Sequence, residues 1–280
     1  MHPPSRSNTW LADCGTRRLT LPATHFFAQG EEITFDYATS EGAFDQTWTC
    51  ACGAAECRGR IQGADWKRPE LQVRYSGHFM PYLASRIAVL RDQREMEKAC
   101  IANWGLSAHR NEALGAYLVA ERAVPAGVTV LVLPPNRILR HHEVKDFERI
   151  LTVRYNASDP ADTSQALYSE SLTASDLDNF MAHSCEPACE AVIDPATLCV
   201  TIRARKPIAA GGLVSIDYEA TETDMVTQGC AFECACGAAR CRKRIVGLWA
   251  RQRMASSGSG GSAQAVAAAA PPVCGLVPQA

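Results

Sequence analysis

The sequence predicts a mostly β protein with some α-helix, an α+β fold, on three observations. Apolar and polar residues alternate in LTLPA, ITFDY, VTIRA and LVSIDY, as is typical of half-buried strands. One stretch, residues 67–104, instead has apolar residues at steps of three and four, which indicates a helix. A cysteine-rich segment occurs twice, which favours metal-binding loops in a chain with no secretory signal.

The chain repeats one arrangement of segments, which divides it into regions. CACGAAECRGRIQG and CACGAARCRKRIVG are identical at eleven of fourteen positions. Each follows a predicted strand, a glycine turn and a second strand that ends in Asp-Tyr. The spacing is too long for a solenoid repeat and indicates a duplicated domain, whose first copy is the shorter. In the first copy these segments are 18–30, 30–37 and 50–63, and in the second they are 200–212, 211–218 and 234–247.

Other elements separate the two copies. Pro81 is expected to kink or divide the helical stretch. Residues 114–133 predict two strands around a Pro-Ala-Gly turn, and residues 138–151 predict a helix with Ile138, Val144, Phe147 and Ile150 or Leu151 inward. The tail is rich in Gly, Ser, Ala and Pro from Ser256 onward and is expected to be disordered. The predicted regions are therefore 1–66, a helical linker 67–104, a domain 105–229, a cysteine motif 230–250 and a disordered tail 251–280.

Each cysteine segment supplies three candidate zinc ligands in a C-x-C-x4-C pattern, Cys50, Cys52 and Cys57 in the first and Cys234, Cys236 and Cys241 in the second. Zinc takes four tetrahedral ligands, and a C-x-C pair is too tight for a disulfide. For the second cluster the fourth ligand is Cys185 or Cys189, both in AHSCEPACE (182–190). For the first cluster, Ser5 aligns with Cys185, and the nearby substitutes are Cys14 and His2.

These motifs, in this order, resemble a SET domain followed by a post-SET motif. AHSCEPAC, GGLVSIDY and FECACGAARCRKRIVG resemble the family patterns N-H-S-C-x-P-N, G-E-E-(I/L)-T-x-D-Y and C-x-C-G-x4-C-R-G. LGAYLVAERAVPAGVTVL resembles the opening of such a domain. The resemblance covers about 105–247 as a whole domain and about 5–63 as the C-terminal remnant of another.

The resemblance implies a SET-type β-clip of small curved sheets with a pseudo-knot, joined to zinc-binding post-SET loops. It implies transfer of a methyl group from S-adenosylmethionine to a lysine of a protein substrate, with histones among the candidates. It selects Cys185 to share one zinc ion with Cys234, Cys236 and Cys241.

The resemblance also implies site residues. Tyr218 would orient the lysine amine, His183 would fix the knot as a structural residue, and Phe232 would cover the adenine. The cofactor-binding positions it implies, besides Phe232, are Leu114, Gly115, Ala116, Ala182 and His183.

Two departures from the family weaken the cofactor site and leave a second reading open. Ala113 replaces the first glycine of a G-x-G turn, and Ala182 replaces an asparagine that helps to hold the cofactor. The alternative is a catalytically degenerate SET-like module that binds zinc and a partner protein.

Composition limits the partners. A net charge of −2 argues against nonspecific or direct nucleic-acid binding. No apolar run approaches the roughly 18 residues of a membrane span, which argues against a membrane protein. The N-terminus has no apolar signal core, so we expect a soluble intracellular protein of the nucleus or the cytoplasm.

Overall fold

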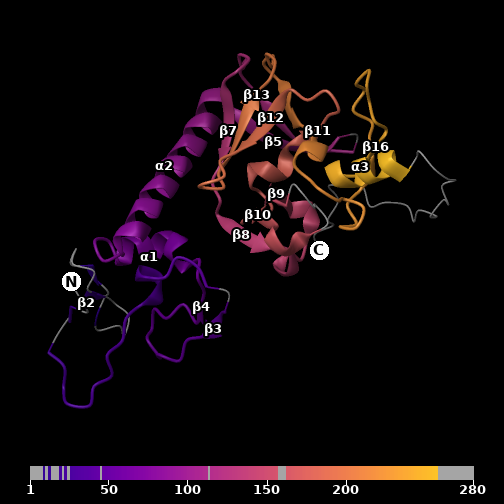
Figure 1. The fold of residues 1–280 in the computed structure, drawn as a ribbon. Coiled ribbons are helices and arrows are strands. Elements are labelled where there is room, and N and C mark those ends of the chain that lie inside the picture. The colour runs from indigo at the N-terminus through magenta and orange to yellow at the C-terminus, as the bar shows by residue number, and fades with distance from the viewer. Residues whose placement is uncertain are drawn as a thin grey trace. The chain divides into compact units, whose positions relative to one another are not determined.

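The structure is a computed structural model that describes residues 9, 12–13, 19–20, 22–23, 26–44, 46–112, 114–156 and 162–257. It comprises two compact units, Met1–Asp92 and Gln93–Ala280, which we describe separately (Figure 1). Small sheets and few helices make it a mixed α+β fold, as the sequence predicts. Across its described part, no helix has both the length and the apolar character that a membrane span requires.

The first unit contains short strand pairs and helices. Strand β1 (Ala12–Asp13) pairs with β2 (Leu19–Thr20), and β3 (Trp48–Thr49) pairs with β4 (Arg60–Ile61), both antiparallel. Two 3-10 turns, η1 (Tyr37–Thr39) and η2 (Asp65–Lys67), and helix α1 (Pro69–Arg74) complete it, together with the first part of α2 (Pro81–Trp104).

The helical prediction for residues 67–104 is confirmed, including its division at Pro81. Helix α2 starts at Pro81, where the missing N–H costs no helical hydrogen bond. The predicted apolar face is buried: Leu83, Ile87 and Leu90 pack around Trp66. Leu71 and Tyr75 pack against Ala38 in a neighbouring cluster.

The predicted strand at 30–37 does not form. Residues 31–36 belong to no strand, and the Ile33 residue is 59% exposed. The equivalent segment of the second unit lies between two strands that hydrogen-bond to it. Around 31–36, the described residues provide one backbone hydrogen bond to a distant segment, from the Thr9 amide to the Thr34 carbonyl (3.0 Å). Alternation of apolar and polar residues is therefore insufficient by itself to make a strand here.

The second unit is built from small sheets. Strands β11 (Ala182–His183), β14 (Gly212–Ile216), β6 (Gly115–Ala120) and β5 (Leu106–Asn111) form one sheet in that order. Strands β12 (Cys189–Ile193), β13 (Val200–Ala204) and β7 (Thr129–Leu133) form a second. Strands β15 (Phe232–Glu233) and β16 (Arg244–Ile245) form a pair. The strands predicted in 114–133, 200–212 and 211–218 are thereby confirmed.

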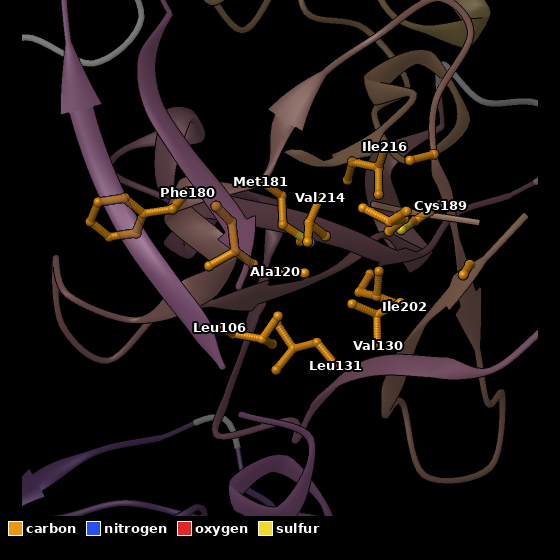
Figure 2. Packing of buried hydrophobic residues seen from close by; sticks show 14 of the residues in the cluster. Leu106, Ala120, Val130, Leu131, Phe180, Met181, Cys189, Ile202, Val214 and Ile216 are labelled. Atoms are coloured by element: carbon orange, nitrogen blue, oxygen red, sulfur yellow. The ribbon is translucent and has the colours of Figure 1, made fainter. Parts of the chain in front are cut away.

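The four-stranded sheet and the sheet of β12, β13 and β7 contribute side chains to one core. Leu118, Val130, Ile202 and Val214 are fully buried in it. Figure 2 shows members of this cluster directed toward one another from both sheets, with Cys189 among them. The core therefore fixes the four-stranded sheet whose end carries the candidate site.

The helix predicted for 138–151 is wrong. The segment contains β8 (Arg137–Arg140), the 3-10 turns η3 (His141–Glu143) and η4 (Phe147–Arg149), and the start of β9 (Ile150–Arg154). Strand β10 (Leu167–Glu170) lies between β8 and β9 and pairs with both, Tyr168 lying opposite Leu139 and Thr152. Pairing with a later strand therefore overrides the local apolar spacing.

A C-terminal helix that the sequence does not predict forms in the structure. Helix α3 (Leu248–Ser257) includes residues 251–257, which the sequence assigns to the disordered tail. Arg251 on this helix pairs with the buried carboxylate of Glu219 (2.6 Å), which anchors the helix to the sheet unit. Residues 258–280, the remainder of the predicted tail, lie outside the described part of the chain.

Candidate functional site

The four-stranded sheet brings distant segments together at one end. Strand β14 runs parallel to β11, with His183 opposite Ile216, and antiparallel to β6, with Val214 opposite Leu118. The end of β14 therefore lies between the start of β6 and His183. The chain continues from this end of the sheet into Tyr218. The residues that lie at the same end are Gly115, Ala116, Ala182 and His183.

Three aromatic rings form a cluster at this end. The ring centroids of His183 and Tyr218 are 5.3 Å apart, and those of His183 and Phe232 are 5.7 Å apart. Tyr218 and Phe232 complete the triangle at 5.9 Å, and every pair meets edge to face. The Tyr218 hydroxyl donates to the Met181 carbonyl at 2.6 Å, so its oxygen has a fixed position.

His183 links this cluster to the cysteines. Its Nδ1 accepts from the Tyr218 amide (3.2 Å), and Nε2 lies 3.4 Å from the Cys185 sulfur. Burial lowers the pKa of His183 to about 4, against the opposing charge of Asp217. The imidazole is therefore neutral at pH 7 and connects the chain after β14 to the loop after β11.

A hairpin between β5 and β6 lies at the same end of the four-stranded sheet. Gly115 has a φ of +66°, a conformation that favours glycine. The exposed Leu114 donates its amide to the Asn111 side chain (2.7 Å), and Ala116 packs against the core. Ala113 lies outside the described residues.

Four cysteine sulfurs meet beside His183. Those of Cys185, Cys234, Cys236 and Cys241 all lie within 4.8 Å of one another, and the Cys185 and Cys234 sulfurs are 3.9 Å apart. Tetrahedral zinc with bonds of about 2.3 Å needs sulfurs ~3.8 Å apart. The donor set and its spacing fit zinc.

Cys189, the other candidate fourth ligand, lies elsewhere. It is fully buried in the core on β12, opposite Ala204, and it is not one of the four. Burial raises the pKa of its thiol to about 11.

Hydrogen bonds prepare the cluster to carry negative charge. Burial opposes ionisation of Cys236, but donation by the Cys185 and Ala238 amides and by neighbouring thiols lowers its pKa to about 6. The Arg242 amide lies 3.4 Å from the Cys185 sulfur. Burial raises the pKa of Cys234 to about 12, and hydrogen bonding with the other thiols adds to the shift. A bound cation would therefore be needed to ionise all four.

The first cysteine cluster has three members. The sulfurs of Cys50, Cys52 and Cys57 lie within 4.8 Å of one another, and no fourth Cys, His, Asp or Glu among the described residues joins them. The proposed substitutes His2 and Cys14, and the aligned Ser5, lie outside those residues. Three thiols fit a zinc site with one position still to be supplied.

The structure reveals an arginine beside each cluster that the sequence reading did not single out. Arg58 binds both Asp36 oxygens at 2.7 Å and the Asp65 carboxylate at 2.6 Å, with its side chain 9% exposed. Arg242, at the matching position, binds Asp217 at 2.6 Å and Glu219 at 2.9 Å. Each arginine thus ties the Asp of an Asp-Tyr pair to a cysteine loop.

Each arginine also pairs with a second carboxylate, and the two units supply it from different positions: Asp65 follows the cysteine segment, whereas Glu219 follows the Asp-Tyr pair. Asp65 accepts from the Gln62 amide (3.1 Å), and Glu219 accepts from the matching Val246 amide (2.9 Å). The Asp and the Arg are identical in both copies of the sequence, a signal that could have revealed half of each network.

Comparison with known proteins supports a family for the central part of the chain. A family model described as the SET domain matches residues 115–219. No curated protein matches the chain. One similar solved structure is KRYPTONITE in complex with mCHG DNA and SAH, at 23% identity and a TM-score of 0.38. The match covers 50% of this chain and 28% of that one. Residues 115–219, which hold the sheet end and most of the aromatic cluster, are thus the part of the chain that matches the SET domain.

Proposed function

We propose that this protein is a methyltransferase that uses S-adenosylmethionine and acts on a lysine side chain of a protein, with histones among the candidate substrates. The observation that carries the proposal is the SET domain at 115–219, with Tyr218 at the sheet end where Gly115 and His183 also lie. The matched segment contains each of these residues.

The chemistry requires a neutral, well-oriented amine. A lysine amine has a pKa near 10.4, so it must lose its proton before its lone pair can react. The Tyr218 hydroxyl donates its hydrogen bond to the Met181 carbonyl, so the lone pairs of its oxygen can accept a hydrogen bond from the amine. That bond would direct the nitrogen lone pair toward the methyl group, which is a positioning role.

The residues that would hold the cofactor lie along the same end of the sheet. S-adenosylmethionine, when bound, supplies the methyl group on its positively charged sulfur. The Gly115 turn lets backbone approach closely, with Leu114 and Ala116 beside it, and the half-buried Phe232 ring would cover the adenine. Ala182 and His183 would border the methionine end, where Ala182 offers no side-chain hydrogen bond.

We also propose the roles of the flanking regions. Cys185, Cys234, Cys236 and Cys241 would hold a structural zinc ion that joins the 230–250 loops to the SET domain. Cys50, Cys52 and Cys57 would hold a second ion within 1–66, a truncated SET C-terminal part. The helical residues 67–104 would connect the two, and 105–229 would be the full SET domain.

Removing the Tyr218 hydroxyl tests the enzyme proposal. We expect Tyr218→Phe to lower the rate of labelled methyl transfer to histones or total protein by about 10²-fold, the size of a misplaced reacting group. Tyr155→Phe, which deletes the same group from an exposed tyrosine, is the matched control. Equal rates for Tyr218→Phe and the wild type would exclude the role.

The binding-module alternative rests on Ala182 in place of the family's asparagine. One lost hydrogen bond costs about 0.5–1.5 kcal/mol, so we expect weak cofactor binding that Ala182→Asn tightens several-fold. Calorimetric titration of S-adenosylmethionine measures both. Binding by neither protein at millimolar cofactor would favour a zinc-dependent interaction module instead.

A further inference from the structure

An aromatic hollow lies in the first unit, apart from the SET domain. It has a volume of about 490 Å³ and is lined by Tyr37, Glu41, Phe44, Gln46 and Trp48. Three of the five residues are aromatic and one is acidic. The proposed methyl transfer uses none of them.

The rings form walls at different angles. The Tyr37 and Trp48 centroids are 5.5 Å apart with their planes at 83°, whereas Phe44 stacks on Trp48 at 5.1 Å and 25°. Tyr37 is 40% exposed and Trp48 is 41% exposed, so part of each ring faces outward. A ligand can therefore touch the face of one ring and the edge or face of the next without displacing either.

One carboxylate supplies negative charge at the hollow. Glu41 is exposed, and it forms no ion pair with the residues that the structure describes. Its amide donates to the Tyr37 carbonyl (2.8 Å), which keeps it next to the ring. The nearby Arg86 lies instead over the Tyr82 ring, 5.6 Å from its centroid. The combination of ring faces and a free carboxylate selects a cation over a neutral apolar group.

The matching tyrosine of the second unit has different ring neighbours. Tyr218 packs against both His183 and Phe232, and its hydroxyl is bound to a backbone carbonyl. Tyr37 has Trp48 at the Phe232 position, but no described histidine packs against it as His183 packs against Tyr218. Phe35 instead packs edge-on against Tyr37, with the ring centroids 5.0 Å apart, so the rings around Tyr37 are arranged differently from those around Tyr218.

We propose that this hollow binds a methylated ammonium group, presented as a methylated lysine of a peptide. Aromatic faces attract cations through their quadrupole, and methylated ammonium ions shed water more easily than a primary ammonium does. Unmodified lysine keeps three N–H donors and strong hydration, so it binds the same rings more weakly. The site is a binding site only and is independent of the proposed methyl transfer.

The test uses the full-length protein and three short synthetic peptides that differ at one side chain: trimethyllysine, unmodified lysine, and a neutral isostere with a tert-butyl group in place of trimethylammonium. Calorimetry without any cofactor measures each affinity. We expect the trimethyllysine peptide to bind at least about fivefold more tightly than either of the others. Equal binding of the neutral isostere would overturn the proposal in favour of an apolar docking groove. Binding by no peptide at millimolar concentration would also overturn it.

Variants locate the site. Trp48→Ala should weaken trimethyllysine binding by about fivefold or more, and Trp48→Phe should restore part of it. Because Trp48 is close to Cys50, metal content and circular dichroism accompany that variant. Glu41→Gln, outside the cysteine loop, should weaken binding by about two- to fivefold. Phe26→Ala, at a fully exposed ring elsewhere in the unit, should have no effect. Unchanged affinity in both Trp48→Ala and Glu41→Gln would place the ligand elsewhere and overturn the assignment.

Discussion

The two cysteine segments have nearly the same backbone but different surroundings. The Cys50 amide donates to the Gly59 carbonyl (2.7 Å), and the Cys234 amide donates to the Lys243 carbonyl (2.6 Å). The short strand pairs also match, with Trp48 opposite Ile61 and Phe232 opposite Ile245. The local sequence therefore specifies the loop, its turn and its strand pair in both units.

What differs is what the rest of the chain adds to each segment. The second segment receives a fourth sulfur from Cys185, which follows a strand of the four-stranded sheet. The first receives no such ligand from its described residues, and the segment before its Asp-Tyr pair belongs to no sheet. The loop therefore forms from local sequence, whereas its connection to the four-stranded sheet depends on distant strands.

The largest expected difference between the segments is in metal retention. Cys234→Ser should abolish tight zinc binding and unfold the region around β15 and β16, because structural zinc contributes folding energy directly. Cys50→Ser should remove a weaker site that mild chelation already empties in the wild type. Metal analysis before and after chelation, with thermal unfolding, checks both. Two equally chelator-resistant ions in the wild type would show that the first cluster is completed by a further ligand.

Removing the arginine beside each cluster should have the larger effect on stability in the first unit. Arg58→Ala leaves the carboxylates of Asp36 and Asp65 buried without their partner, at a cost of about 3–5 kcal/mol of unfolding free energy. Arg242→Ala should cost less, about 1–3 kcal/mol, because Glu219 keeps Arg251 and Asp217 is partly exposed.

Urea denaturation of the metal-loaded protein measures the arginine effects. Arg244→Ala is the control, since its side chain is 55% exposed and lies 3.9 Å from Glu233. A larger loss for Arg242→Ala than for Arg58→Ala would contradict the ranking.

The two units should also respond to pH in opposite directions. Burial opposes ionisation of Asp36, but Arg58 holds its pKa below the usual range, so its stabilisation is present above pH ~4 and is lost as the pH falls further. Burial raises the pKa of Glu222 in the second unit to about 8. Between about pH 4 and 8 folded Glu222 keeps a proton that the unfolded chain has lost, so stability falls as the pH rises.

Replacing Glu222 isolates this pH response. Glu222→Gln keeps an oxygen that can accept from the Thr152 hydroxyl, now 2.9 Å away, but removes the titration. Its stability advantage over the wild type should grow with pH by up to about 1.4 kcal/mol per unit between pH 5 and 8. Denaturation midpoints at several pH values check this. A constant difference across that range would show that Glu222 does not titrate with folding.

The smallest effect concerns one turn position. Gly59 and Lys243 occupy matching positions with φ of +71° and +66°, a region that disfavours side chains. Gly59→Ala should therefore destabilise the first unit by about 1 kcal/mol. Lys243→Gly should change stability by less than about 0.5 kcal/mol, since relief of strain is offset by the flexibility of glycine in the unfolded chain. Thermal melting of both variants checks the asymmetry.

Local patterns made much of the fold predictable. Pro81 fixed the start of the long helix, and the spacing of Leu83, Ile87 and Leu90 identified its buried face. The Pro-Ala-Gly turn correctly separated β6 from β7. These features depend on residues close together in sequence, so periodicity and turn chemistry report them directly.

Features that depend on distant partners were not predictable. Ile138, Val144 and Phe147 have spacing suited to a helix, yet pairing with the strand around Tyr168 determines the structure there. At the candidate site, the cysteines could be named from their spacing. The choice between Cys185 and Cys189 required the family resemblance, and the structure places only Cys185 with the cluster.

Joining Cys185 to the second cysteine loop has a consequence for the unfolded chain. Cys185 and Cys234 are 49 positions apart, and a cross-link across such a loop removes about 4 kcal/mol of chain entropy from the unfolded state. A metal ion held there would act as a staple that encloses β12, β13 and β14. Cys50 and Cys57 enclose only about seven residues, for which the same relation gives about 2 kcal/mol. A metal ion on those three thiols would stiffen one loop, whereas an ion on the four thiols would restrict about a third of the matched segment 115–219.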